Sequence, residues 1–240
     1  MPRILLGAGH EGVTTGAVGA PNEQSFNIDI CNKVADELRK RGFEVRRINA
    51  HPKPEEIAGD WDLALFCHYD ADIYGTGGGF VDYPEPSTDK ATIESQRIAY
   101  LLRQEYFGTT HIVSHPERSN ANTRYYYMWK ALSAKTPCVI IECGVGMHVP
   151  DDHQILHFNR PLVVEGIVKG ICLAFNVPYA LPEPPTTSPE PPGSVPPPET
   201  TIPTDELIQK IRDVVYSKWT WAGVKNGWKL RRKQLMELLP

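Results

Sequence analysis

The chain has 240 residues, of which 41% are hydrophobic and 22% charged, and its formal net charge is -4. This composition is typical of a soluble globular protein with room for one domain and an appendage. The mild acidity gives no reason to expect a nucleic-acid partner, and no apolar run approaches the roughly 20 residues of a transmembrane helix.

At its start, Met1-Pro2-Arg3 is followed by only three apolar residues before Gly7. A secretory signal peptide has an apolar stretch of about 7–15 residues. We therefore expect the protein to be made in the cytoplasm without a signal peptide.

Residues 1–180 alternate strand-like and helix-like segments, which predicts an α/β domain whose largely parallel, twisted sheet is flanked by helices. Short β-like runs predict strands at residues 3–6, 43–48, 63–67, 110–114 and 137–142. Helical patterns predict helices at residues 25–41, 92–106, 124–133 and 160–175. The first helix shows the pattern best, because Phe26, Ile30, Val34 and Leu38 recur every four positions before Gly42.

The composition changes after residue 180. Residues 181–203 are dominated by proline, which favours an extended, semi-rigid linker. Residues 204–240 regain a helical apolar stripe, hold three of the five tryptophans, and carry eight Lys and Arg against four Asp and Glu, a charge of +4. This short helical tail is expected to bind an anionic polymer, to associate with other copies of itself, or to dock on its own domain.

Five cysteines are present, an odd number, and none forms a CxxC pair. Four of them lie in apolar segments, which predicts reduced, buried thiols and argues against a zinc site made of cysteines.

Residues 7–12 read Gly-Ala-Gly-His-Glu-Gly, a literal GxGxxG after the first predicted strand, which is typical of a dinucleotide-binding fold. The context argues against that function. The residues that follow are rich in glycine and threonine and form a poor helix sequence, and the second strand ends at Arg46 and Arg47 without an acid to hold a ribose.

A metal site accounts for the histidine in this motif as well. His10 follows the first strand, Glu23 opens the first helix, and His68 and Glu142 end two further strands. Ligands of α/β sheets gather beyond the carboxyl ends of the strands. Two imidazoles and a carboxylate suit a catalytic zinc ion, which keeps a fourth position for water. We predict one zinc ion bound by His10, Glu23 and His68, with Glu142 as general base.

Each of these four residues also has a structural interpretation. His10 can cap its loop, His68 can be a satisfied buried histidine, Glu23 can be a first-turn acid that favours the helix dipole, and Glu142 can form a salt bridge. A lone charge at Glu142, behind three apolar residues, would however be expensive to bury. The prediction rests on all four occurring in this order.

These positions resemble the zinc N-acetylmuramoyl-L-alanine amidases of the type 3 amidase family, and the resemblance covers residues 3 to about 177. Residues 9–12, 16–19 and Glu23 are similar to the GHxG, GAxG and downstream glutamate of the family, and residues 67–70 and 137–144 to its segments with the second zinc histidine and the catalytic glutamate. The resemblance implies a bacterial wall-remodelling enzyme or phage endolysin that cleaves the amide between N-acetylmuramic acid and L-alanine of peptidoglycan by zinc-activated water.

Some features depart from the family pattern. Glu11 replaces a glycine, Tyr69 replaces a small residue, and residues 75–86 have no counterpart, so substrate preference within peptidoglycan is left open. His115 and Arg124 are candidates for substrate contacts. In such an enzyme the tail would bind anionic wall polymers or self-associate, and the enzyme would reach the wall when the cell lyses. A zinc peptidase acting within the stem peptide and a non-catalytic wall-binding module are the alternatives.

Overall fold

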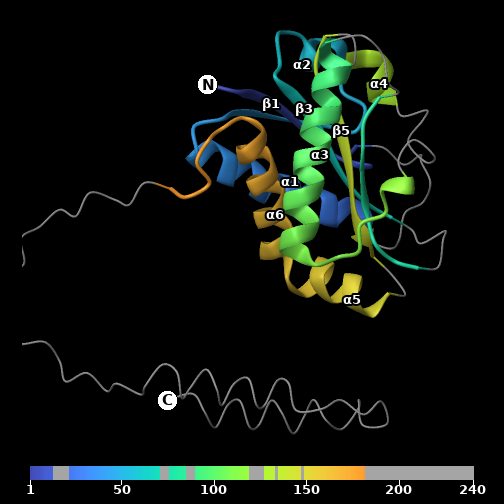
Figure 1. Ribbon diagram of the computed structural model, residues 1–240. Helices are drawn as coiled ribbons and strands as arrows, with labels where there is room; N and C mark the ends of the chain where they lie inside the picture. Colours follow the sequence, from blue (N-terminus) through green and yellow to red (C-terminus); the bar gives the residue numbers. More distant parts are fainter. Residues whose placement is uncertain are drawn as a thin grey trace, which may run out of the picture. The chain divides into compact units, whose positions relative to one another are not determined.

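The computed structural model describes residues 1–12, 22–70, 76–84, 90–118, 127–132, 135–146 and 149–181 (Figure 1). The chain divides into two units, Met1–Glu183 and Pro184–Pro240, and all described residues belong to the first. Arg124, the predicted linker beyond Leu181, and the predicted tail lie outside the described residues. The division into a domain, a linker and a tail therefore stays a prediction.

A five-stranded sheet forms the centre of the described unit. Its strands are β1 (Arg3–Ala8), β2 (Glu44–Ile48), β3 (Leu63–Asp70), β4 (Phe80–Asp82) and β5 (Cys138–Val145). They lie in the order β2-β1-β3-β5-β4, and only β4 runs antiparallel to its neighbour. The predicted mixed fold with a largely parallel sheet is confirmed. The central strands β1, β3 and β5 are nearly continuous apolar runs, as expected for strands that are buried on both faces.

Helices cover both faces of the sheet. One face packs against α1 (Glu23–Lys40), α3 (Lys90–Thr110) and α6 (Arg160–Ala174), whose buried side chains share one core with Leu6, Leu65 and Val139 (Figure 1). The other face, with Leu5, Phe66 and Ile140, packs against α4 (Tyr127–Leu132) and touches α2 (Pro54–Ile57). Three short helices complete the unit: η1 (Pro116–Arg118), α5 (Pro150–His153) and η2 (Gln154–Phe158).

The helix α1 follows its predicted pattern closely. Phe26, Ile30, Val34 and Leu38 are all fully buried, and the chain turns away at Gly42, whose φ of 84° suits a glycine. The helix begins at Glu23, so the candidate ligand lies in the first turn, at the end of the helix that faces the carboxyl edge of the sheet.

The predicted strand at residues 110–114 is wrong. The helix α3 continues to Thr110, whose hydroxyl donates to the carbonyl of Tyr106, and His111 ends the helix in a left-handed conformation with φ of 61°. Only Ser114 retains an extended pairing, a single bridge to Gly79. The fifth strand is β4 instead, which lies in the segment for which the sequence suggested no role.

All five cysteines are free and buried, as predicted. Of the helix predicted at residues 124–133, the part within the described ranges is α4. No described helix has both the length and the apolar character that a bilayer-spanning segment needs.

Candidate metal centre

His10 lies just beyond β1 in an unusual backbone conformation. Its φ is 63°, a region that costs a residue with a side chain about 1–3 kcal/mol and that is found repeatedly at functional sites. The side-chain amide of Gln24, on α1, donates to the carbonyl of His10 and holds this turn against the helix. The imidazole of His10 is thereby directed towards the N-terminus of α1.

Glu23 stands between the two candidate histidines. Its Oε1 lies 3.2 Å from Nε2 of His10 and 3.2 Å from Nδ1 of His68. The two imidazoles meet edge to face with their centroids 5.2 Å apart. The three residues come from the β1 turn, α1 and β3, so the fold brings together the three ligands that the sequence predicted.

The glycines of the literal GxGxxG motif have a packing function here. A Cβ on Gly9 would lie 2.3 Å from the His68 ring, and a Cβ on Gly7 would lie 2.3 Å from the Phe66 ring. Both rings project from β3 against β1, which is hydrogen-bonded to β3 in parallel register. These two glycines therefore make room for the rings of β3, one of which belongs to the candidate ligand His68.

Electrostatics favour an ionised Glu23. Burial alone would raise its pKa, but hydrogen bonds from His10 and His68 outweigh burial and hold the pKa of Glu23 at about 2. The same hydrogen bond with Glu23 raises the pKa of His10 against the opposing effect of burial. The cluster therefore contains an anionic carboxylate and two polarised imidazoles, a donor set suited to a cation.

Glu142 occupies the neighbouring strand at the same level. It is the register partner of His68 across β3 and β5, and of Phe80 across β5 and β4, so its half-buried side chain lies on the same face as His68. Burial, followed by the negative charges of Glu23, Asp70 and Asp82, raises the pKa of Glu142 well above its usual value. The site thus holds two carboxyl groups whose pKa values are shifted in opposite directions, that of Glu23 down and that of Glu142 up.

The three candidate ligands fit a metal ion. Their ligand atoms all lie within 4.8 Å of one another, and they are the one such group among the described residues. A tetrahedral zinc ion with bonds of 2.0–2.2 Å would separate its ligand atoms by about 3.3–3.6 Å, near the two 3.2 Å distances at Glu23. Small side-chain adjustments would therefore suffice to coordinate such an ion.

His115 lies at the same edge of the sheet, further along it. The segment before η1 pairs with Gly79, which directly precedes β4, and the His115 ring packs where a side chain on Gly78 would otherwise point. Nδ1 of His115 lies 2.6 Å from Oε1 of Glu117, which orients the ring. No described contact joins His115 to the His10, Glu23 and His68 cluster. Arg124 lies outside the described residues.

Sequence reasoning missed two residues that support the site. Asn27 donates to Glu23 from the next turn of α1, and the only signal for it was a polar residue among the buried positions of that helix. Asp152 accepts from the backbone N–H groups of Gly78 and Val145, at 2.7 and 2.9 Å, and so ties the segment before β4 to the end of β5. No sequence pattern marks Asp152.

The fold and the site define an α/β protein with a His-Glu-His cluster able to bind a metal beside a glutamate of raised pKa. The profile of the family described as N-acetylmuramoyl-L-alanine amidase matches residues 4–172, which is more than half of the chain. The chain belongs to this family, whose members hydrolyse peptidoglycan. No curated protein sequence matches it.

Solved structures of such amidases share the fold. An N-acetylmuramoyl-L-alanine amidase from Clostridium difficile 630 superposes with a TM-score of 0.55 at 18% identity, over 73% of this chain and 97% of that one. The amidase Ami1 from Mycobacterium smegmatis gives 0.55 at 21% identity, over 73% and 97%. The catalytic domain of CD27L, an endolysin targeting Clostridia difficile, gives 0.55 at 19% identity, over 72% and 98%.

Proposed function

We propose that this peptidoglycan amidase is zinc-dependent, with one zinc ion bound by His10, Glu23 and His68 and with Glu142 as the general base. The observation that carries the proposal is the convergence of three ligand atoms within 4.8 Å, next to a glutamate in register with one of the ligands. Family membership supplies the reaction, hydrolysis of the amide between N-acetylmuramic acid and L-alanine.

The bound zinc ion would supply Lewis acidity, which polarises the scissile carbonyl and lowers the pKa of the attacking water. The chain's own contribution is proton transfer. Glu142 takes a proton from that water as its oxygen attacks the carbonyl carbon, and passes the proton to the nitrogen of L-alanine as the carbon–nitrogen bond breaks. Transfer of this kind typically contributes about 10²–10⁴-fold to the rate.

The environment of Glu142 suits both halves of this transfer. Burial and the surrounding carboxylates favour the protonated form of Glu142, whereas a nearby cation would favour its carboxylate form. The proton affinity of Glu142 is thus balanced between opposing influences, as a group that accepts and then releases a proton requires.

The remaining assignments extend this proposal to the substrate. His115, oriented by Glu117 at the same edge of the sheet, and Arg124 are proposed to contact the sugar or the stem peptide. Residues 1–180 are proposed as the catalytic domain, residues 181–203 as the linker, and residues 204–240 as a tail that binds the wall or self-associates. Release during lysis would bring the enzyme to its substrate.

Metal analysis combined with a Glu142→Ala variant tests the proposal. The purified parent should contain one zinc ion per chain and should lose lytic activity on chelation. Glu142→Ala should retain the zinc but hydrolyse peptidoglycan about 10²–10⁴-fold more slowly, because the base is absent while the ligands remain. Full activity of a protein that holds no zinc, or of Glu142→Ala, would refute the assignment.

The bond that is cleaved separates the proposal from its alternatives. An amidase releases new N-terminal alanine from purified peptidoglycan, whereas a zinc peptidase exposes other N-termini of the stem peptide. A non-catalytic wall-binding module would release neither. Labelling the new amino groups and identifying them by mass spectrometry distinguishes the three outcomes.

A further inference from the structure

We propose that Asn27 is a positioning residue of the metal centre, which holds the Glu23 carboxylate in place relative to both histidine-bearing segments. Asn27 lies one helical turn beyond Glu23 on α1 and is fully buried. The inference rests on the proposed zinc function, because it assigns Asn27 a role in preparing the ligand set for the ion.

Two hydrogen bonds place Asn27 at a junction of the site. Its amide nitrogen Nδ2 carries two hydrogens and lies 3.2 Å from Oε1 of Glu23 and 3.2 Å from the carbonyl oxygen of Gly9. The backbone N–H of Gly9 in turn donates to the carbonyl of Cys67 at 2.9 Å. His10 follows Gly9 in the chain, and His68 follows Cys67. One side-chain amide therefore links the ligand on α1 to the backbones that carry the other two ligands.

An amide is an expensive choice for packing at this position. Asn27 lies on the buried face of α1 with Phe26 and Ile30, where an apolar side chain would bring no polar group of its own that has to be satisfied. Its Oδ1 accepts no hydrogen bond within the described part of the chain, so only the donor side of the amide is used. A residue present for stability alone would not need that uncompensated oxygen.

The amide nitrogen of Asn27 has a role that an apolar side chain at this position could not fill. Within the described part of the chain, the other side chains that hydrogen-bond to Glu23 are the two imidazoles, and these must turn their nitrogens to the ion when it binds. Asn27 is not itself a ligand, so it can donate to the Glu23 carboxylate both before and after the ion binds. Hydrogen bonds of this kind orient metal-binding side chains, and their loss typically weakens metal affinity by about 10–100-fold.

The zinc affinity of an Asn27→Leu variant of the full chain tests the proposal. We expect its dissociation constant for Zn²⁺, measured by competition with a chelator, to rise about 10–100-fold over that of the parent. Leucine has the same number and branching of side-chain heavy atoms as asparagine, so the unfolding transition of the metal-free variant should remain cooperative. Absorption spectra of the cobalt-substituted proteins should also differ, which reports altered ligand geometry and not altered stability.

Cys31→Ala provides a matched control. Cys31 is buried one turn further along α1 and contacts the carbonyl of Gly7, but no described contact joins it to Glu23. This variant should lose stability and keep the zinc affinity and cobalt spectrum of the parent. If Asn27→Leu behaves in the same way, Asn27 is a packing residue and the inference is wrong.

Two further outcomes separate this inference from the proposed function. A parent that binds no zinc contradicts both, whereas a parent that binds zinc with the same affinity as Asn27→Leu contradicts the inference alone. If Asn27→Leu does not fold, Asn27→Ser, which keeps one hydrogen-bond donor, takes its place. That variant should show a smaller loss of affinity in the same direction, and an affinity equal to that of the parent would overturn the inference.

Discussion

The two carboxyl groups of the candidate site, Glu23 and Glu142, owe their different pKa shifts to their neighbours. Glu23 accepts hydrogen bonds from two imidazoles, which hold its pKa at about 2 against the effect of burial. The pKa of Glu142 is raised by burial and by the negative charges of Glu23, Asp70 and Asp82. Environments that separate the pKa values of two titratable groups in this way support the proposed division of roles between them. Glu23 suits a permanent anionic ligand, and Glu142 suits a group that exchanges protons.

This arrangement predicts the effect of Asp70→Asn on the pH dependence of hydrolysis. The rate constant kcat/KM should fall as the pH decreases through the pKa of the general base, because only the carboxylate form of Glu142 accepts a proton. The charge of Asp70 raises the pKa of Glu142, so its removal lowers that pKa and moves the acidic limb of the profile to lower pH. Arg118, whose Nη1 lies 4.0 Å from Oδ2 of Asp70, would act in the same direction once Asp70 is neutral.

Asp36→Asn is the control for this measurement. Asp36 lies near the far end of α1, where its exposed carboxylate pairs with Arg39. Its removal should leave the acidic limb unchanged. An unshifted limb in Asp70→Asn, or a shift to higher pH, would show that Glu142 is not the group whose titration limits the reaction.

The proximity of the candidate ligands and base could be predicted from sequence, because His10 follows a strand, Glu23 opens a helix, and His68 and Glu142 lie near the carboxyl ends of two strands. In a parallel sheet the strand ends share one edge, so His10, His68 and Glu142 had to approach one another once β1, β3 and β5 were recognised. Asn27 and Asp152 could not be predicted in the same way. Their roles depend on the packing of α1 against Gly9 and of α5 against β5, which no local pattern encodes.

At the scale of elements, there is a physical reason why the sequence predicted the fifth strand at residues 110–114 and not at β4. The β-branched run around Thr110 indicated a strand, but Thr110 is the last residue of the helix α3, and its hydroxyl donates to the carbonyl of Tyr106 one turn earlier, a bond that threonine makes within helices. The true edge strand β4 has only three residues and is preceded by glycines, which indicate a loop. Backbone proximity explains one of these glycines: a Cβ on Gly79 would lie 2.2 Å from the carbonyl oxygen of Glu142.

Gly79→Ala should therefore destabilise the protein and reduce activity. The clash involves backbone atoms of β5, which cannot rotate away, so β4 must separate from the strand that carries Glu142. Overpacking of this kind typically lowers the free energy of unfolding by about 1–3 kcal/mol. Denaturant titration of the zinc-loaded protein and a lysis assay would measure both effects.

Gly108→Ala is the matched control for the added methyl group. Gly108 lies on α3, is exposed, and has no atom within 4 Å of the position of an added Cβ. Alanine should be neutral there or stabilise the helix by up to about 1 kcal/mol, with activity unchanged. If Gly79→Ala is as well tolerated as Gly108→Ala, the contact between β4 and β5 does not constrain the site.

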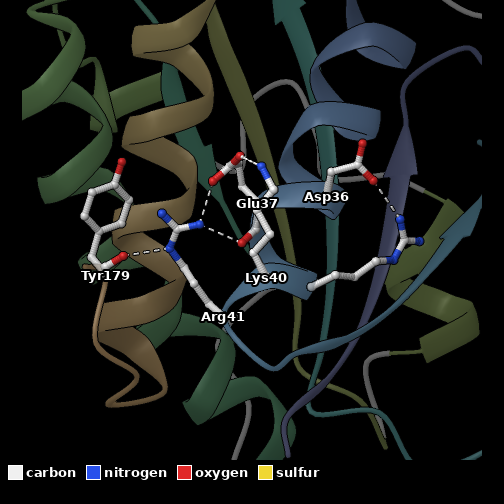
Figure 2. A network of polar contacts seen from close by, with 6 residues as sticks. Asp36, Glu37, Lys40, Arg41 and Tyr179 are labelled. Atoms are coloured by element: carbon white, nitrogen blue, oxygen red, sulfur yellow. Dashed lines mark hydrogen bonds and ion pairs between the residues drawn. The ribbon is translucent and has the colours of Figure 1, made fainter. Parts of the chain in front are cut away.

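At the scale of the whole molecule, α1 connects the site to the end of the described unit. Glu23 is its first residue, and Arg41 follows its last. Figure 2 shows Arg41 reaching Glu37 and Tyr179: its Nε donates to the carbonyl of Tyr179 at 2.8 Å, and its guanidinium lies 4.6 Å from the centre of the tyrosine ring. With 18 residues, α1 separates these two ends by about 27 Å.

The segment that ends near Tyr179 is therefore part of the folded unit, and the boundary proposed after Ala180 preserves its contacts. In the predicted linker, the 22 proline-rich residues 182–203 could span up to about 70 Å at roughly 3.1 Å per residue. Such a spacing serves little purpose if the tail only packs on its own domain. The apolar stripe, tryptophans and basic residues of the tail favour binding to the wall or self-association.

We accordingly predict that truncation after Ala180 leaves a folded, zinc-containing enzyme that cleaves soluble muropeptides at the parent rate. It should lose retention on intact walls or change its oligomeric state, because the adhesive segment is gone. Sedimentation with purified walls and light scattering of both forms distinguish these roles. Truncation after Phe175 is the control and should lower stability, because it removes two further contacts of the folded unit. These are the hydrogen bond from the N–H of Val177 to the carbonyl of Cys172 and the one from Arg41 to the carbonyl of Tyr179. If truncation after Ala180 lowers stability alone and leaves both other properties unchanged, the tail belongs to the catalytic fold and the proposed boundary is wrong.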